Sequence, residues 1–253
     1  MTFRDAPRFP TTLPVPSKAR ERGISLFVVI VFVMLSMLLA LWASRTSLFS
    51  EWIVGNDTDY QRAFEAAQAL IQDAELDIRE ENAKGALCAA PAGDGGRVCR
   101  KGAAMPRPPL EAQETIQLLA YLQSQATGCK DGLCLKRSGD QDFWNDPATL
   151  QAMAVDGIGA RFGDYTGAKT GNNSNPILSN TSSATAGGWY WVEVLPYVEN
   201  GGNAGLISNA PANYLPLHMV PNVVYRITAI AYGLKPGSMV VLQQSYARRK
   251  AAD

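Results

Sequence analysis

The chain has 253 residues, and its 23 lysines and arginines balance its 23 aspartates and glutamates. Nucleic-acid binding generally needs a basic surface to neutralise phosphates, so the zero net charge argues against that class of protein. His218 is the only histidine, which argues against histidine-rich zinc sites and makes any histidine-based catalytic centre depend on this one residue. We therefore expect no nucleic-acid partner, no metal or other cofactor, and no enzymatic activity.

The apolar residues are concentrated near the N-terminus. Residues 24–44 form a run of 21 residues without a charged side chain, and a helix of this length spans about 30 Å, the thickness of a bilayer core. Residues 1–23 carry five basic and two acidic side chains, a net charge of +3. This predicts a single membrane-spanning helix with the N-terminus in the cytoplasm and the bulk of the chain outside it. A signal peptide cleaved near Ser44 fits less well, because the apolar run is long and the cleavage sequence is poor.

The next segment, residues 45–83, is predicted to be amphipathic and helical. It is rich in alanine, glutamate, glutamine and leucine, which favour helix formation. Gly55 and Asn56 need not end the preceding helix, so we expect one helix from residue 24 to about 83. Apolar residues recur at steps of three and four and share one face of this helix. They are Tyr60, Phe64, Ala67, Leu70, Ile71, Ala74 and Ile78.

The remainder, residues 84–253, predicts a domain with both helix and sheet. Residues 110–125 carry an incomplete apolar stripe with glutamates in the first turns, which is typical of a helix. A loop rich in glycine, asparagine, serine and threonine follows at residues 164–188. Three runs with strand character come after it, and a turn containing proline and glycine joins the last two. These runs are residues 188–195, 223–232 and 239–246.

The alternation within the second of these runs predicts how the sheet packs. Tyr225, Ile227 and Ala229 alternate with the residues between them, so they point to one face, which we expect to be the face covered by the long helix. The fold class is therefore α+β, a long N-terminal helix packed on a C-terminal antiparallel sheet.

Four cysteines, Cys88, Cys99, Cys129 and Cys134, all follow the apolar run. They can be paired in three ways. The local choice joins Cys88 to Cys99 and Cys129 to Cys134, which closes two loops that have little core of their own. The spacings argue against a zinc site, and an oxidising compartment outside the cytoplasm favours disulfides.

Three other motifs are better explained by structure than by ligand binding. Residues 163–170 lack the spacing of a phosphate-binding loop. Residues 138–146 offer several oxygen ligands but lack the glycine and glutamate of a calcium-binding EF-hand loop, so we expect a solvated turn. The aromatic run at residues 189–191 lies in a predicted strand, where core packing is the simpler explanation.

The junction at Arg22, Gly23 and Ile24, followed by Ser-Leu-Phe, resembles the processing site of a type IV prepilin. The resemblance implies that a prepilin peptidase cleaves after Gly23 and that the new amino terminus at Ile24 is methylated. It also implies that removal of the leader frees the apolar helix to leave the bilayer for the core of a helical filament.

Val28 departs from the pattern of major pilins, which carry a glutamate at this fifth mature position. In that family the carboxylate is thought to pair with the amino terminus of a neighbouring subunit. A charge at bilayer depth is costly without a partner. Its absence at Val28 therefore implies a subunit without such a neighbour, as at the filament tip or in an initiation complex.

Other segments resemble the PilX family of minor pilins. Gly55-Asn56 followed by residues 62–68 and 73–75 is similar to the pattern of their first helix. Residues 225–228 and 240–246 are similar to their closing strands, and residues 132–134 ahead of Trp144 to a shared disulfide segment. The resemblance implies a pilin-like fold and a minor pilin that takes part in pilus assembly or initiation, at or near the tip, with a role in adhesion or aggregation.

The partners implied by this resemblance are the prepilin peptidase, other minor pilins, a tip adhesin, the major pilin filament and the inner membrane. The chain would lie in the inner membrane with a periplasmic C-terminal domain before assembly, and in the pilus at the cell surface afterwards. Two alternatives stay open. One is a tip pseudopilin of a type II secretion system, and the other is a single-pass, membrane-anchored adhesive module.

Overall fold

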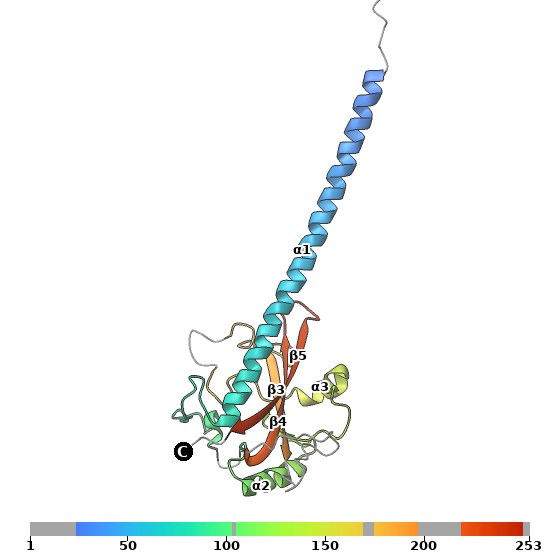
Figure 1. Ribbon diagram of the computed structural model, residues 1–253. Helices are drawn as coiled ribbons and strands as arrows, with labels where there is room; N and C mark the ends of the chain where they lie inside the picture. Colours follow the sequence, from blue (N-terminus) through green and yellow to red (C-terminus); the bar gives the residue numbers. More distant parts are fainter. Residues whose placement is uncertain (1–23, 103–104, 169–174, 197–218, 250–253) are drawn as a thin grey trace, which may run out of the picture. The chain divides into compact units, whose positions relative to one another are not determined.

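The computed structural model describes residues 24–102, 105–168, 175–196 and 219–249. The leader, residues 1–23, falls outside these ranges, and so does His218. The chain divides into two compact units, Met1–Ile53 and Val54–Asp253. Helix α1 (Ile24–Arg79) is 56 residues long and contributes to both units (Figure 1). The prediction of one continuous helix is confirmed, and the helix ends four residues before the predicted position.

In the first unit, residues 24–53 of α1 are exposed along their whole length. The helix is long and apolar enough to cross a membrane, judged by length and composition. Exposed leucine, valine, isoleucine and phenylalanine on every side of a helix are typical of a segment whose surroundings are apolar.

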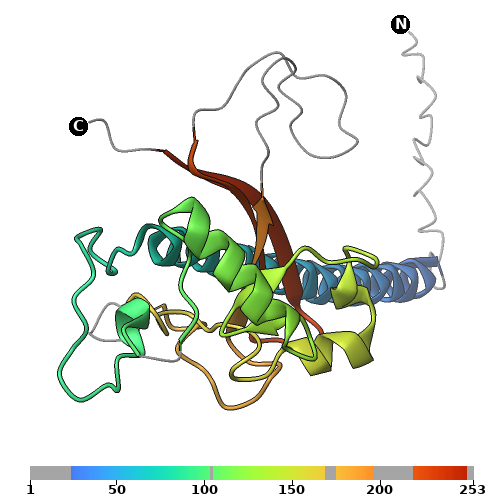
Figure 2. The ribbon, with the colours of Figure 1, turned by 90° about the horizontal axis from the view of Figure 1, so that it is seen from below.

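The second unit contains a five-stranded sheet in the order β1-β2-β3-β4-β5. Its long strands, β3 (Gly188–Pro196), β4 (Met219–Tyr232) and β5 (Met239–Arg249), are antiparallel and confirm the three predicted runs. Figure 2 shows β4 and β5 as a strongly twisted pair, as expected for long neighbouring strands.

The sheet is mixed rather than wholly antiparallel. Two short strands, β1 (Cys129–Lys130) and β2 (Leu133–Leu135), form a hairpin, and β2 pairs with β3 in parallel. Strands of two and three residues are too short to show an alternation in sequence, so they could not be predicted from periodicity.

Helix α2 (Ala112–Gln123) confirms the second predicted helix, and Glu111 and Glu114 form a capping box at its start. A further short helix, α3 (Pro147–Met153), was not predicted. The Asp146 carboxylate accepts hydrogen bonds from the backbone N–H groups of Ala148 and Thr149, and Pro147 occupies the first helical position. Asp146, one of the possible oxygen ligands at residues 138–146, is therefore a helix cap.

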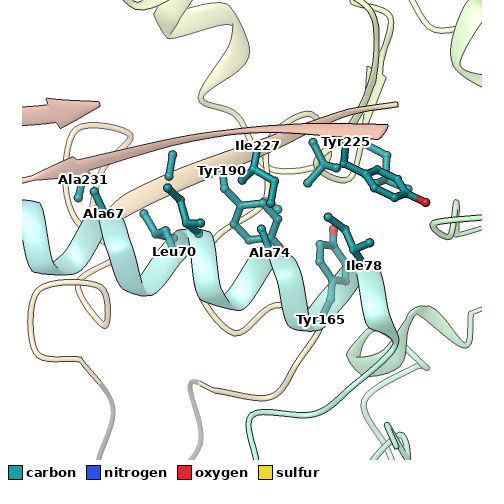
Figure 3. Close-up of a cluster of buried hydrophobic side chains, with 14 of the residues drawn as sticks. Ala67, Leu70, Ala74, Ile78, Tyr165, Tyr190, Tyr225, Ile227 and Ala231 are labelled. Carbon is teal, nitrogen blue, oxygen red and sulfur yellow. The ribbon is translucent and has the colours of Figure 1, made fainter. Parts of the chain in front are cut away.

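The main core lies between α1 and one face of the sheet. Figure 3 shows Ala67, Leu70, Ala74 and Ile78 of α1 facing alternate residues of β3 and β4. The predicted alternation is confirmed, since Tyr225, Ile227, Ala229 and Ala231 all belong to this cluster. Tyr60, which was predicted to share the buried face of α1, is instead 51% exposed.

The other face of the sheet has a second, smaller core. Trp189 and Trp191 of β3 pack there with Ile230 of β4, Phe143 and the Cys129–Cys134 pair. Tyr190, between the two tryptophans, points into the main core (Figure 3). The aromatic run therefore packs in both cores, as predicted, because neighbouring residues of a strand face opposite sides.

Candidate functional site: the buried face of α1 and the loops it holds

Three carboxylates lie on the buried face of α1. Asp59, Asp73 and Asp77 are each no more than 4% exposed. Their spacings of 14 and 4 residues are close to whole turns of an α-helix, so they share a face with the alanines that contact the sheet. Buried carboxylates are rare without partners, and each of these three binds a different segment of the domain.

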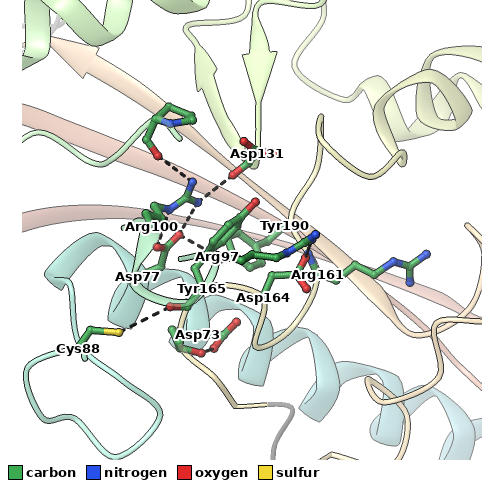
Figure 4. A network of polar contacts seen from close by, with 12 residues as sticks. Asp73, Asp77, Cys88, Arg97, Arg100, Asp131, Arg161, Asp164, Tyr165 and Tyr190 are labelled. Atoms are coloured by element: carbon green, nitrogen blue, oxygen red, sulfur yellow. Dashed lines mark hydrogen bonds and ion pairs between the residues drawn. The ribbon is translucent and has the colours of Figure 1, made fainter. Parts of the chain in front are cut away.

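Asp77 forms a buried ion pair with Arg100. The guanidinium donates from Nε to Oδ1 and from Nη2 to Oδ2 of Asp77, both at 2.7 Å. It also donates to the carbonyl oxygens of Pro106 and Asp131, at 3.1 and 2.8 Å. Its Cζ lies 3.5 Å from the ring centroid of Tyr165, a cation–π contact. Figure 4 shows Arg100 at the centre of this network.

The charge of Arg100 is maintained despite complete burial. Burial alone lowers the pKa of Arg100, but the charge of Asp77 and its hydrogen bonds outweigh this effect and raise the pKa above its ordinary value. Because Arg100 follows Cys99, the ion pair fastens the disulfide loop at Cys88–Cys99 to the C-terminal end of α1.

Asp73 holds a second loop. It accepts a hydrogen bond from the backbone N–H of Gly163 at 2.7 Å and another from the hydroxyl of Thr166. Burial, together with the nearby carboxylates of Asp77 and Asp164, raises the pKa of Asp73 to about 7, even though the two hydrogen bonds favour the charged form. The carboxyl group therefore titrates near neutral pH.

Asp59 holds the turn between β4 and β5. Its carboxylate accepts from the backbone N–H groups of Leu234 at 2.8 Å and Lys235 at 3.1 Å. Burial raises the pKa of Asp59, but hydrogen bonds from Ser238 and from these two N–H groups outweigh it, so the pKa lies below its ordinary value. Asp59 thus acts as an anionic cap on a hairpin turn more than 170 residues away in sequence.

All three carboxylates are already occupied by structural partners. Among the described residues there is no group of three or more histidine, cysteine or acidic side chains placed to hold a metal ion. The three carboxylates attach loops of the domain to helix α1. This arrangement was not predicted from the sequence, although one signal was present, since acidic residues at 59, 73 and 77 recur in phase with the apolar face.

Two disulfides are present, Cys88–Cys99 and Cys129–Cys134. The second joins residues that lie directly opposite each other in the β1–β2 hairpin. This is the local pairing considered from the sequence.

The remaining predicted site residues lie in the first unit. Ile24 is the first residue of α1, and Val28 follows one turn later with 41% of its surface exposed. Gly23 falls outside the described residues, as do residues 169 and 170 of the glycine-rich motif.

Comparison with protein families gives two matches. Residues 22–71 match the family described as PilX N-terminal, and residues 130–248 match the family described as type IV pilus assembly protein PilX C-term. Together they cover more than half of the chain. The chain belongs to the PilX family. It is therefore a type IV pilus assembly protein, from a family of structural pilus components that interact with other parts of the pilus. No curated protein and no solved structure matches it significantly.

The PilX matches divide the polar network. Asp59 lies in the N-terminal match and the Gly163–Thr166 loop in the C-terminal match, whereas Asp73, Asp77 and Arg100 lie between the two. The segment outside both matches, residues 72–129, also contains the Cys88–Cys99 loop and α2. Asp73 therefore joins this intervening segment to the PilX C-terminal region through Gly163 and Thr166. The Asp77–Arg100 pair lies within the intervening segment, and Arg100 reaches the C-terminal region through the carbonyl oxygen of Asp131.

Proposed function

We propose that this chain is a minor pilin that initiates type IV pilus assembly and occupies a position at or near the filament tip. The observation that carries the proposal is Val28. It lies on a helical segment, residues 24–44, that has no charged side chain and is exposed throughout. A subunit that enters a filament below another one benefits from a carboxylate at this depth, because it neutralises the amino terminus of its neighbour. A subunit with no neighbour above it gains nothing from that charge.

The proposal includes the processing and location of the chain. The prepilin peptidase cleaves after Gly23, Ile24 is methylated, and the chain rests in the inner membrane with residues 84–253 in the periplasm until assembly. The excess of basic residues in the leader supports a cytoplasmic N-terminus. Two disulfides in the second unit support a periplasmic location, because disulfides persist in oxidising compartments. Other minor pilins, a tip adhesin and the major pilin are the proposed partners.

The test combines processing and assembly. Mass spectrometry of the mature chain should find methylated Ile24 as its first residue, and a start at Met1 or near Ser44 would overturn the proposal. A strain lacking the gene should have few or no surface pili. Normal piliation with lost cell aggregation would instead assign the chain to adhesion, the second role that the sequence suggests.

A substitution at Val28 tests the tip assignment directly. In the deletion strain, Val28→Ala should restore piliation, because it keeps the segment uncharged. Val28→Glu should restore it poorly, because a tip subunit offers the carboxylate no partner and the charge is costly within the bilayer. Full restoration by Val28→Glu, with the subunit found along the filament shaft, would contradict the assignment.

A further inference from the structure

Strand β5 forms one edge of the sheet. It is the last strand in the order β1-β2-β3-β4-β5, and among the described residues it pairs only with β4. The strand at the opposite edge, β1, is two residues long and is closed by the Cys129–Cys134 disulfide. β5 is therefore the long edge at which a further strand can pair with this sheet.

The hydrogen bonds of β4 show which backbone groups of β5 face outward. Tyr232 is opposite Met239 in the register, yet its N–H donates to the carbonyl oxygen of Gly187, on the side of β3, at 2.9 Å. Bonded and non-bonded pairs alternate along antiparallel strands, so the bonded pairs with β5 begin at Ala231 and Val240. The residues of β5 whose N–H and C=O groups point away from the sheet are then Met239, Val241, Gln243 and Ser245.

No feature of this sequence protects the edge from pairing. Residues 239–247 contain no charged residue, proline or glycine, and their pairing with β4 is regular throughout. Gln243 and Ser245 are exposed. Natural sheets usually protect an edge with a lysine, a proline or a bulge, or keep it short or covered. An edge of this length without any of these devices is suited to pairing with another strand in the assembled pilus.

The direction of β5 argues against a second copy of this chain as the partner. β5 runs in the same direction as α1, because it follows the turn bound to Asp59 and because Tyr246, near its end, accepts a hydrogen bond from Arg79 at 3.3 Å. Two copies joined by their β5 edges around a two-fold axis would pair antiparallel, and residues 59–79 of their helices would point in opposite directions. Two chains anchored in one membrane by the apolar run before these residues cannot adopt that arrangement. The strand must come from a different protein.

Arg248 places one cation at the end of this edge. Its side chain is partly exposed, and among the described residues it forms no ion pair. The acidic side chains Glu75 and Glu81, at the same end of α1, are both paired with Arg79. An acidic residue of an incoming strand would compensate the charge of Arg248, and uncharged residues would match the rest of the edge.

We propose that the β5 edge accepts a strand from a different protein of the pilus, a largely uncharged extended segment with an acidic residue next to Arg248. The outward N–H and C=O groups of Val241, Gln243 and Ser245 pair with the backbone of this segment, as when an extended peptide adds a strand to a sheet. The acidic residue determines which end of the segment lies at Arg248. This inference rests on the proposed function for the membrane anchoring that excludes a second copy and for the place where the partner is met.

The test is photo-cross-linking in piliated cells, with benzoylphenylalanine in place of Gln243 or Ser245, one position at a time. Both positions should form an adduct with the same second protein, and peptide sequencing should locate the two cross-links two residues apart in one segment, because paired strands keep a period of two. Benzoylphenylalanine in place of Ile116, which is 70% exposed on α2, should not reach that segment. No adduct, adducts with a second copy of this chain, or adducts without a common register would overturn the proposal.

Matched variants test the backbone contacts, with the cross-linker kept in place of Ser245. Gln243→Pro removes one outward N–H and leaves the hydrogen bonds to β4 in place, since an edge strand tolerates proline where the N–H faces outward. It should lower the yield of the adduct at least about threefold, whereas Gln243→Thr, which keeps the N–H, should not. Urea unfolding of the full-length variants in detergent checks that both are folded. Equal yields from folded Gln243→Pro and Gln243→Thr would contradict pairing through the backbone.

Arg248 provides a test that does not depend on proline. Arg248→Gln should lower the yield about two- to fivefold, whereas Arg248→Lys, which keeps the charge, should retain most of it. No effect of Arg248→Gln would contradict the proposed acidic residue. The adducts are measured in cells that keep the gene, so this result is decided separately from the piliation of the deletion strain, which tests the assembly role.

Discussion

The Asp77–Arg100 pair provides the sharpest test of how the loops are attached to α1. Both side chains are at most 4% exposed, and Arg100 makes four hydrogen bonds as well as its contact with the Tyr165 ring. Replacing Asp77 with leucine leaves a buried guanidinium with only two carbonyl partners. Removing one member of a buried pair typically costs about 3–5 kcal/mol, because the remaining charge is uncompensated. We expect Asp77→Leu to lower the free energy of unfolding by that amount.

The assay is urea unfolding of the full-length chain in detergent, followed by the fluorescence of the buried tryptophans Trp189 and Trp191. The double variant Asp77→Leu/Arg100→Met removes both charges and should recover much of the loss, because a buried pair contributes little beyond its apolar replacement. Glu75→Gln is the control. Its carboxylate is partly exposed and 3.5 Å from Arg79, so the change should stay within about 1 kcal/mol.

The coupling energy between the two substitutions decides whether the Asp77–Arg100 pair holds the disulfide loop on α1. The ion pair does not hold the disulfide loop on α1 if Asp77→Leu costs less than about 1 kcal/mol. The same conclusion follows if the double variant is as unstable as the sum of the Asp77→Leu and Arg100→Met single variants. Burial of the two charges would then contribute nothing measurable to the stability of this site.

The pKa of Asp73 rises from 3.8 to about 7 on folding, so its contribution to the free energy of unfolding is fully present below about pH 4 and is lost as the pH rises through 7. Thermal unfolding across this range should show a loss of stability of up to about 4 kcal/mol, which Asp73→Asn abolishes. An unchanged pH profile in the variant would contradict this prediction. Replacing both Cys88 and Cys99 by serine should lower stability in urea by about 2–3 kcal/mol, and no difference between the variant and the oxidised chain would show that the disulfide is absent or unimportant. A β-carbon at Gly188 would lie 2.6 Å from a carbonyl oxygen of β4, so Gly188→Ala should lower the free energy of unfolding by about 1–3 kcal/mol in the same assay. Gly139 has open space around it, so Gly139→Ala should be nearly neutral. Equal effects of the two substitutions would refute the close packing at Gly188.

Long elements could be predicted from the sequence because their periodicity is repeated. Helix α1, strands β3 to β5 and the two faces of β4 all follow from apolar spacing over nine or more residues. Three elements are too short for a repeated pattern: β1, β2 and α3 have two, three and seven residues. They are determined by contacts with neighbouring segments rather than by their own periodicity. β2 exists because its backbone pairs with β3, and that partner lies more than 50 residues away.

The buried carboxylates were missed for a related reason. An aspartate on an amphipathic helix normally indicates a solvated position. Asp59 and Asp73 are buried because backbone N–H groups of Leu234 and Gly163 reach them, and a backbone donor leaves no mark in the sequence. Tyr60 was assigned to the buried face because it is apolar and in phase, yet Asp59 beside it is the residue that contacts the β4–β5 turn. The backbone N–H groups of this turn are paired by the carboxylate acceptor of Asp59, and the aromatic ring of Tyr60 could not accept their hydrogen bonds in this way.

The two parts of α1 are suited to different surroundings, and this limits which part can lie in a membrane. Residues 24–44 have no charge, whereas the buried face from Asp59 to Asp77 carries three carboxylates whose partners exist only when the domain is folded around the helix. Sliding α1 further into a bilayer would strip those carboxylates of their partners, at a high cost. The contacts that the folded domain makes with Asp59, Asp73 and Asp77 therefore oppose such sliding.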